Sequence, residues 1–486
     1  MGDRLGSLKP QPLWDIFEEM CARPRPSKKE EAVVEYVLEF CEENSLDYVR
    51  DDAGNIIIRV PATPGFEDKK TVILQGHLDM VCEKNSDVVF DFETEGIRPY
   101  VDGDWVKAEG TTLGADNGIG AAAALAVAVD TTIEHGPLEI LLTLDEETGL
   151  TGATNLGTDL LDGEILLNLD SEEIGELYIG CSGGRDTKGT IYFEQEEAPE
   201  NYLFYEVLVS GLKGGHSGLD INTGRGNAIK ILARILNTLQ QYYLVSVAEV
   251  QGGSKRNAIP REASAILAVD PEDETVVLEE VIEFEKTVKA ELATVEPNLR
   301  VVIRKIEEKK NVLDEVSEDQ LILMLYALPH GVLKMSADIP GLVETSTNLA
   351  TVTMHEGRIE IGTSQRSSVE SEIEDAVTMV SSVFELGGAE VETGDGYPGW
   401  KPDVNSEILK VTKDAYHSLY GKVPEVKAIH AGLECGIIKE KYPNMDMVSF
   451  GPTITGAHSP DEQVNISSVE KFWFHLVKVL ETVPER

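Results

Sequence analysis

The sequence predicts an α/β protein with a mainly parallel sheet and helices on both faces, plus an inserted α+β domain of ferredoxin-like order. Short apolar runs of strand length alternate with helical patterns at both ends of the chain. The middle of the chain instead has the order strand, helix, strand, strand, helix, strand. The 486 residues also exceed what one hydrophobic core usually supports. We therefore expect a discontinuous first domain over residues 1–186 and 394–486, and an inserted second domain over residues 187–393.

The N-terminal part supplies the first strands and helices of the predicted sheet. Apolar residues recur at three- and four-residue steps in residues 13–43, which predicts helix. An alanine-rich run over 117–130, with Gly118 and Gly120, predicts a helix slim enough to pack closely on a sheet. The other predicted elements here are strands over 56–60, 72–74, 138–144 and 164–169.

The inserted part has its own periodic pattern. Its ferredoxin-like portion comprises strand 203–210, helix 228–239, strands 244–250 and 263–269, helix 276–292 and strand 299–306. A helix near 318–328, paired strands around 349–354 and 358–361, and a helix near 369–384 are predicted to follow.

The alternating pattern resumes in the C-terminal part. A helix over 406–420 is followed by Gly421, which is placed to end it. A strand over 445–450 comes next, and the last helix covers 469–480. The spacing of Ser467 and Glu470 matches a capping box that would open this helix.

The composition excludes several classes of partner. With 42 basic and 87 acidic residues, the net charge of −45 argues against nucleic acids and anionic membranes. The five cysteines are odd in number and lack CxxC spacing, which favours a reducing compartment over a disulfide scaffold. Residues 1–12 have no apolar core of signal-peptide type, and no later run is long and uncharged enough to cross a bilayer. We expect a cytoplasmic protein with neither kind of partner.

Acidic residues and histidines follow the predicted strands. His77 and Asp79 come just after the strand 72–74, and alternation along an extended chain places them on one side. Asp116 precedes the alanine-rich helix, whose N-terminus favours negative charge. In open α/β sheets the crevice beyond the carboxyl ends of the strands binds ligands. The other candidates at this edge are Glu146 and Glu147 after strand 138–144, Asp170 after strand 164–169, and His458 after strand 445–450.

Such a cluster of acids predicts bound cations. Several carboxylates within a few ångströms repel one another, and a metal ion removes that conflict. Imidazole and carboxylate ligands without cysteine suit Zn(II), with Mn(II) or Co(II) as alternatives. The residues are too many for one tetrahedral catalytic ion, so two divalent ions bridged by a shared carboxylate fit better. The reaction class that follows is hydrolysis.

Nine short motifs carry a family resemblance that runs nearly end to end. In their order along the chain they resemble those of the aminoacyl-histidine dipeptidases (Xaa-His dipeptidases, carnosinase-like), a branch of the cocatalytic-zinc peptidase family. Carboxypeptidase G and acetylornithine deacetylase belong to the same family. The motifs are Gly76–Asp79, Gly114–Gly118, Asp145–Gly149, Asn168–Glu172, Lys213–Gly218, Lys255–Pro260, Tyr397–Trp400, His430–Gly436 and Ala457–Glu462.

The resemblance implies a role for each candidate residue of the metal site. It implies that Glu146 is the general base, which takes a proton from the metal-bound water, leaves a metal-bridging hydroxide, and delivers the proton to the leaving amine. Asp79 would orient His77 through its other ring nitrogen. The peptide bond between Asp116 and Asn117 would be cis. The metal ligands would be Asp116 as the bridge, His77 and Asp170 on one ion, and Glu147 and His458 on the other.

The resemblance also assigns the inserted domain the role of a lid. His216 would reach the tetrahedral oxyanion, across a dimer interface or on lid closure. Asn257 and Arg366 would hold the backbone and terminal carboxylate of the dipeptide. The alternatives are that Gly214–Gly218 is only a flexible turn and Arg366 only a surface charge. Glu172 and Glu173 are expected to be exposed.

The prediction is a cytoplasmic metallodipeptidase that acts on Xaa-His, carnosine-like or a broader range of dipeptides, as a homodimer through the lid. One alternative is an amidohydrolase that removes the acyl group from N-acyl amino acids. Another is a metal-binding relative without catalytic activity. Glu146 argues against the second alternative, because a site for binding alone needs the five ligands and not the base.

Overall fold

The computed structural model describes residues 5–486, which form two compact units. Unit 1 contains the chain up to Gly180 together with Pro402–Ala428 and Leu433–Arg486. Unit 2 contains Cys181–Lys401 and Ile429–Gly432. Residues 1–4, part of the stretch expected to lack a signal peptide, lie outside the described residues.

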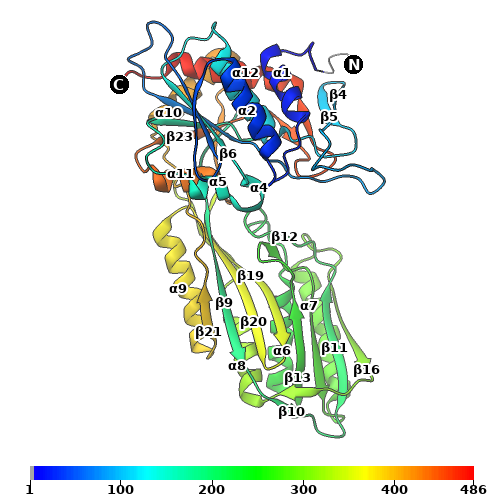
Figure 1. Ribbon diagram of the computed structural model, residues 1–486. Helices are drawn as coiled ribbons and strands as arrows, with labels where there is room; N and C mark the ends of the chain where they lie inside the picture. The colour runs from blue at the N-terminus through cyan, green and yellow to red at the C-terminus, as the bar shows by residue number, and fades with distance from the viewer. Residues whose placement is uncertain (1–4) are drawn as a thin grey trace. The chain divides into compact units, whose positions relative to one another are not determined.

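Unit 1 is built on an eight-stranded sheet with the order β1-β2-β6-β3-β7-β23-β8-β22 (Figure 1). The four central strands, β6, β3, β7 and β23, are parallel, which confirms the predicted parallel core of the sheet. The flanking pairs β1–β2, β2–β6 and β23–β8 are antiparallel. The strands are β1 (Asp47–Arg50), β2 (Ile56–Val60), β3 (Val72–His77), β6 (Leu138–Thr143), β7 (Ile165–Asn168), β8 (Glu176–Cys181), β22 (Glu425–Ile429) and β23 (Asp446–Ser449). A small sheet joins β4 (Pro99–Asp102), β5 (Trp105–Ala108), β24 (Ile454–Thr455) and β25 (Gln463–Asn465).

Helices cover both faces of this sheet (Figure 1). The alanine-rich helix α3 (Ala115–Val129) packs on β3 and on α1 (Gln11–Cys21). A Cβ atom at Gly120 would lie 2.3 Å from the carbonyl oxygen of Leu169, so this close packing requires glycine. The remaining helices are α2 (Glu31–Glu43), α4 (Glu146–Gly149), α5 (Thr151–Asn155), α10 (Glu407–Tyr420), α11 (Glu434–Lys441) and α12 (Ile466–Thr482).

Two local predictions in unit 1 are wrong. The expected helix over 13–43 is two helices, α1 and α2, and the gap between them contains Pro24 and Pro26. Proline lacks the N–H that a continuous helix would use. The last helix begins at Ile466, and the side chain of Asn465 accepts the N–H of Ser468. Asn465 therefore caps this helix, and the expected capping residue, Ser467, lies inside it.

Unit 2 contains a long antiparallel sheet with the order β16-β11-β15-β13-β19-β20-β9-β21, and β18 pairs with β19. Its first four strands have the ferredoxin-like connectivity that the sequence predicts. The strands are β9 (Gly183–Tyr192), β11 (Leu203–Ser210), β13 (Val245–Gly252), β15 (Ala263–Val269), β16 (Arg300–Ile306), β18 (Gly331–Met335), β19 (Val343–His355), β20 (Arg358–Ser367) and β21 (Glu390–Thr393). Two short pairs join β10 (Gln195–Glu197) to β17 (Asn311–Leu313) and β12 (Gly215–His216) to β14 (Ala258–Ile259).

Four helices pack on this second sheet (Figure 1). Apolar side chains of the helices and the sheet form one large core cluster, which includes Leu232, Phe284, Leu325 and Phe384. The helices are α6 (Ala228–Tyr242), α7 (Glu274–Glu291), α8 (Glu315–Ala327) and α9 (Glu370–Leu386).

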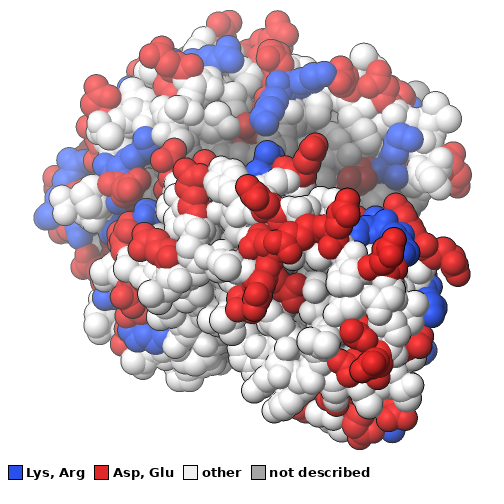
Figure 2. Space-filling model, turned by 90° about the horizontal axis from the view of Figure 1, so that it is seen from below, with Lys and Arg blue, Asp and Glu red and all other residues white. Residues whose placement is uncertain are grey.

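The surface reflects the acidic composition. Figure 2 shows a patch of Asp and Glu side chains across the centre of one face, with fewer Lys and Arg side chains around it. Within residues 5–486, every helix is too short or too polar to cross a membrane.

His475 on α12 provides a pH-dependent contribution to stability. Its side chain is buried, its ring lies 5.1 Å from that of Tyr416 and 4.7 Å from that of Phe450, and Nε2 is 2.8 Å from the Thr412 carbonyl oxygen. Burial lowers the pKa of His475 from 6.5 to about 4, against the opposing effect of the Thr412 carbonyl. The unfolded chain therefore takes up a proton at this residue at a higher pH than the folded chain does.

We expect the free energy of unfolding to fall as the pH drops from 6.5 to 4, with a contribution from His475 of up to about 3 kcal/mol. In His475→Gln, the thermal midpoint should depend less steeply on pH over this range than in the wild type. Calorimetry between pH 4 and 7.5 measures this slope, and exposed His417→Gln is the control. Equal slopes in wild type and His475→Gln would contradict the assignment.

Candidate metal centre

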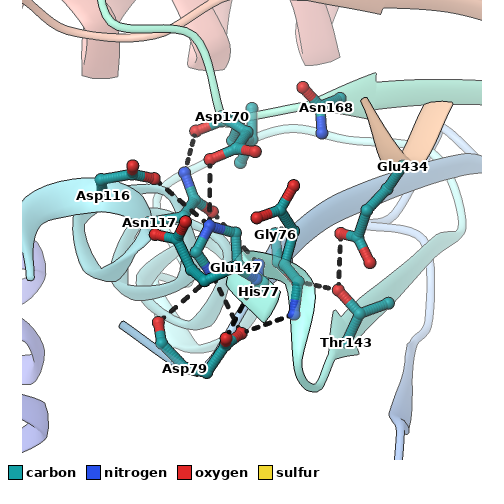
Figure 3. Close-up of polar contacts among 12 residues, drawn as sticks. Gly76, His77, Asp79, Asp116, Asn117, Thr143, Glu147, Asn168, Asp170 and Glu434 are labelled. Carbon is teal, nitrogen blue, oxygen red and sulfur yellow. Dashed lines mark hydrogen bonds and ion pairs between the residues drawn. The ribbon is translucent and has the colours of Figure 1, made fainter. Parts of the chain in front are cut away.

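His77 ends the central strand β3, whose six residues are all buried. Its Nδ1 is 3.2 Å from Asp79 Oδ1, and its Nε2 is 3.2 Å from Asp116 Oδ1 and 3.4 Å from Asp170 Oδ1 (Figure 3). One ring nitrogen thus faces a single buried carboxylate. The other faces two further carboxylates, a position from which it can bind an ion together with them.

The carboxylate of Asp79 is fixed on both oxygens. Ser27 Oγ donates to Oδ2 at 2.7 Å, the N–H of Glu147 donates to Oδ2 at 3.2 Å, and the N–H of Glu146 donates to Oδ1 at 3.0 Å. Burial favours the neutral acid, but His77 and these hydrogen bonds prevail and lower the pKa of Asp79 to about 2. Asp79 therefore connects His77 to the backbone that carries Glu146 and Glu147.

Asp116 lies between the two predicted histidines. Its Oδ1 faces His77, and its Oδ2 is 3.2 Å from Nε2 of His458. Gly114, just before it, has φ 70°, a conformation that favours glycine. The Asp116–Asn117 peptide bond is cis, as the resemblance implies. Burial opposes ionisation of Asp116, but the two imidazoles hold its pKa well below the ordinary value.

Unit 1 brings all the predicted metal residues together in overlapping groups. Nε2 of His458 is 3.0 Å from Glu147 Oε2. Within each group, the possible ligand atoms lie within 4.8 Å of one another, and Asp116 belongs to two groups. The groups are His77 with Asp116 and Asp170, Asp116 with Glu147 and His458, and His77 with Glu146 and Glu147.

The residues present fit divalent cations. Glu147 Oε1 is buried and has no hydrogen-bond partner within residues 5–486. Asp170 Oδ1 is also buried and faces Nε2 of His77 at 3.4 Å. Burial, with the nearby charges of Asp116 and Glu434, raises the pKa of Asp170 to about 7 against the opposing effect of His77. Buried acceptors of this kind are costly unless a cation or a proton satisfies them. Imidazole and carboxylate donors without thiolate suit zinc and related ions.

Glu146 is suited to proton transfer. Its backbone is held by Asp79, and its side chain belongs to the third group of candidate ligands. Burial raises the pKa of Glu146 well above its ordinary value; the charge of His77 opposes this rise, and Asp170 and Glu434 add to it. A carboxylate with a raised pKa can take a proton and hold it near neutral pH.

One acid near the centre differs from the prediction, and a second, expected near the site without a role, has contacts that the sequence does not reveal. Glu172 was expected to be exposed, but it is half-buried, and burial with the charges of Asp116 and Asp170 raises its pKa to about 8. Glu434 received no predicted role; its Oε2 accepts hydrogen bonds from Gln75 and Thr143, both at 2.7 Å. Its Oε1 is buried without a partner within residues 5–486. The only sequence signal for Glu434 is the motif His430–Gly436.

The residues predicted to bind substrate lie in unit 2. Arg366 on β20 is buried, and its Nη1 donates to the Tyr397 hydroxyl at 2.7 Å. Burial lowers the pKa of His216, and the nearby charge of Arg366 lowers it further. His216 and the exposed Asn257 line a cavity of about 920 Å³.

The chain is similar to known peptidases. The model for "Peptidase family M20/M25/M40" matches residues 73–482. The chain is 46% identical over 482 residues, 99% of each chain, to a cytosol non-specific dipeptidase of Escherichia coli K12. Its structure is similar to that of an aminoacylhistidine dipeptidase from Vibrio alginolyticus, with a TM-score of 0.94 and 45% identity over 100% of this chain and 99% of the other. Aminopeptidase PepT from Bacillus cereus shares the fold, with a TM-score of 0.58 and 17% identity over 98% of this chain and 100% of the other.

The fold and the cluster of imidazoles and carboxylates are those of a metallopeptidase. The family model matches most of the chain, and a relative is similar over its full length. The chain therefore belongs to peptidase family M20/M25/M40. It is therefore an enzyme, and the resemblance to the aminoacyl-histidine dipeptidases is confirmed.

Proposed function

We propose that this protein is a cytoplasmic dipeptidase that uses two divalent metal ions. Its substrates would be free dipeptides, including Xaa-His and carnosine-like dipeptides within a broad range. The main observation in support is that two groups of candidate ligands share Asp116, as a bridged pair of ions requires. The names of the two full-length relatives support the choice of dipeptides.

The ions would be held by five side chains of unit 1. Asp116 would be shared by both ions, His77 and Asp170 would hold one of them, and Glu147 and His458 would hold the other. Zn(II) is the ion that this donor set favours, with Mn(II) or Co(II) as alternatives. Such ions, when bound, polarise a peptide carbonyl and make water more acidic.

Glu146 is the proton carrier of the reaction. It accepts a proton from the attacking water and passes this proton to the nitrogen of the leaving amine as the C–N bond breaks. The acyl carbon thus gains the OH of the water and the amine gains its H. Asp79 keeps the His77 ring oriented through the contact at Nδ1, and its hydrogen bond to the N–H of Glu146 fixes the base relative to that ring.

The inserted domain, residues 187–393, would act as the lid over the catalytic domain formed by residues 1–186 and 394–486. His216 would donate to the oxyanion, and Asn257 would hold the dipeptide backbone. Arg366 would bind the terminal carboxylate, for which its planar fork of N–H groups is suited. We also propose a homodimer through this domain, which sedimentation of the intact protein would test.

Arg366→Lys should lower kcat/KM for dipeptides by about 10- to 100-fold, mainly through KM, because the ammonium group cannot form the two parallel hydrogen bonds of the guanidinium. For a dipeptide amide, which lacks the terminal carboxylate, kcat/KM should differ little between the wild type and this variant. Arg358→Lys, at an exposed position on the same strand, is the control. An equal loss on dipeptide and dipeptide amide would contradict the carboxylate role.

The proposed function is tested with enzyme stripped by a chelator and then restored with Zn(II), Mn(II) or Co(II). The substrates are a panel of dipeptides, carnosine, tripeptides and N-acetyl amino acids. We expect hydrolysis of dipeptides only when metal is restored, and weak or no hydrolysis of N-acetyl amino acids. Preferential hydrolysis of N-acetyl amino acids would favour the amidohydrolase alternative. Metal binding without any hydrolysis would favour the non-catalytic alternative.

A further inference from the structure

The carboxylate of Glu462 is buried in unit 1 and accepts four backbone hydrogen bonds from residues 113–116, which end the loop before α3 and begin that helix and are called the Asp116 loop below. Its Oε2 accepts the N–H groups of Leu113 at 2.7 Å and Gly114 at 2.9 Å. Its Oε1 accepts those of Ala115 at 2.8 Å and Asp116 at 3.2 Å. The side chain is 3% exposed, so all four contacts lie away from water. A buried carboxylate bound in this way fixes the loop that presents Asp116.

The same loop is held from its carbonyl side by Arg25. Nη2 of Arg25 donates to the carbonyl of Gly114, and Nη1 donates to the carbonyl of Leu78 at 3.0 Å. Leu78 follows His77 directly, so Arg25 ties the loop to the end of β3. The loop therefore has fixed positions relative to both His77 and Glu462.

Glu462 belongs to the turn that presents His458. Within this turn, Ser459 Oγ donates to the carbonyl of Gly456 at 2.7 Å, and the N–H of Glu462 donates to the carbonyl of Ser459 at 3.0 Å. A short ordered turn thus separates the imidazole of His458 from the carboxylate that holds the Asp116 loop. His458 itself is half-exposed, with 53% of its side chain accessible. The imidazole contacts Asp116 and Glu147, and the turn that carries it is held by the two hydrogen bonds above.

We propose that Glu462 is a positioning residue that sets the separation between His458 and Asp116. It thereby controls the affinity of the ion held by Asp116, Glu147 and His458 more than that of the ion held by His77, Asp116 and Asp170. This inference rests on the proposed two-ion centre. Glu462 touches only backbone N–H groups of the loop in the contacts described, so it acts through other residues and not on the substrate.

Glu462→Gln separates the charge and hydrogen-bonding roles from the size of the side chain. The amide has nearly the same shape, but its NH₂ group would face two backbone N–H groups. Two hydrogen bonds would therefore be lost, and N–H groups would point at the NH₂ group. Outer contacts of metal ligands contribute about 10- to 100-fold to metal affinity. We expect the dissociation constant of one ion to rise by about that factor, while the other ion stays tightly bound.

The experiment uses the full-length wild type, Glu462→Gln and the neighbouring exposed variant Asp461→Asn. Zn(II) stoichiometry and both dissociation constants are measured by titration in chelator-buffered solutions, and kcat and KM for a dipeptide are measured at limiting and saturating Zn(II). In Glu462→Gln, the affinity for one of the two ions should fall, and saturating Zn(II) should restore kcat. Asp461→Asn should match the wild type in every measurement.

The outcomes separate this inference from the proposed function. A wild type that binds fewer than two ions, or hydrolyses no dipeptide, would refute the two-ion proposal itself. If the wild type binds two ions, any of three results would overturn the positioning role. These are unchanged affinities in Glu462→Gln, an equal loss of affinity for both ions, and a kcat that stays low at saturating Zn(II). If Glu462→Gln lacks the wild-type near-ultraviolet circular dichroism, Glu462→Asp decides: it keeps the charge but is one methylene shorter. It should weaken the same ion, and an unchanged affinity would overturn the inference.

Discussion

Glu146→Gln should lower kcat by about 10²- to 10⁴-fold while the protein keeps both metal ions. Glutamine has almost the shape of glutamate but cannot accept a proton from water. The five side chains proposed to hold the ions are unchanged, and the hydrogen bond from the Glu146 N–H to Asp79 comes from the backbone, so the variant should retain it. The measurement is kcat for a dipeptide beside the metal content per chain by mass spectrometry.

The matched control for this variant is Glu173→Gln, which makes the same chemical change at an exposed position. It should retain the wild-type kcat and metal content. A Glu146→Gln protein with near wild-type kcat would remove Glu146 from the role of general base. A variant that instead lost an ion would identify Glu146 as a ligand, a role that its place in the third group of candidate ligands also permits.

Asp116→Asn should weaken both ions and abolish activity. The two oxygens of Asp116 face different imidazoles, so one side chain serves both groups of ligands. Asparagine keeps the shape but loses the charge and one of the two ligand oxygens. Because outer contacts alone are worth about 10- to 100-fold, loss of a bridging ligand should cost more than about 100-fold in affinity for each ion. Titration with Zn(II) and the residual kcat measure this effect.

His458→Ala provides the contrast to Asp116→Asn. It should weaken only the ion shared with Glu147, because His458 contacts Asp116 and Glu147 and neither His77 nor Asp170 in the contacts described. Asp159→Asn, which makes the same chemical change as Asp116→Asn at an exposed position, is the control for the loss of one acid. If Asp116→Asn weakened one ion alone, Asp116 would be a ligand of that ion and not a bridge.

The candidate metal residues were predictable because each follows a recognisable strand or opens a helix. His77 ends β3, Asp170 follows β7, and parallel neighbours bring their carboxyl ends to one edge of the sheet. The order of elements in unit 2 was predictable for a similar reason, since its helices and strands have clear and different periods. Local patterns carry this information without knowledge of the distant contacts.

Other features depend on contacts that no local pattern encodes. Glu462 and Arg25 hold the Asp116 loop from opposite ends of the sequence, and their neighbours in the chain give no sign of it. Glu172 looked like a solvated acid in an acidic turn, but packing around the centre half-buries it. The predictions of two helix ends are wrong for a different reason. Pro24 and Asn465 are ordinary local signals, but they compete with nearby signals such as the spacing of Ser467 and Glu470.

The position of β23 has a consequence for biosynthesis. This strand is translated late, yet it pairs with β7, which leaves the ribosome long before it. During translation, the emerging chain therefore carries β7 with one open edge, a surface on which nascent polypeptides can associate. The same order of synthesis delays the turn of His458 until after β23. If His458 binds an ion as proposed, a chain that ends before this turn lacks one proposed ligand and should be inactive. Its open strand edge would also favour aggregation.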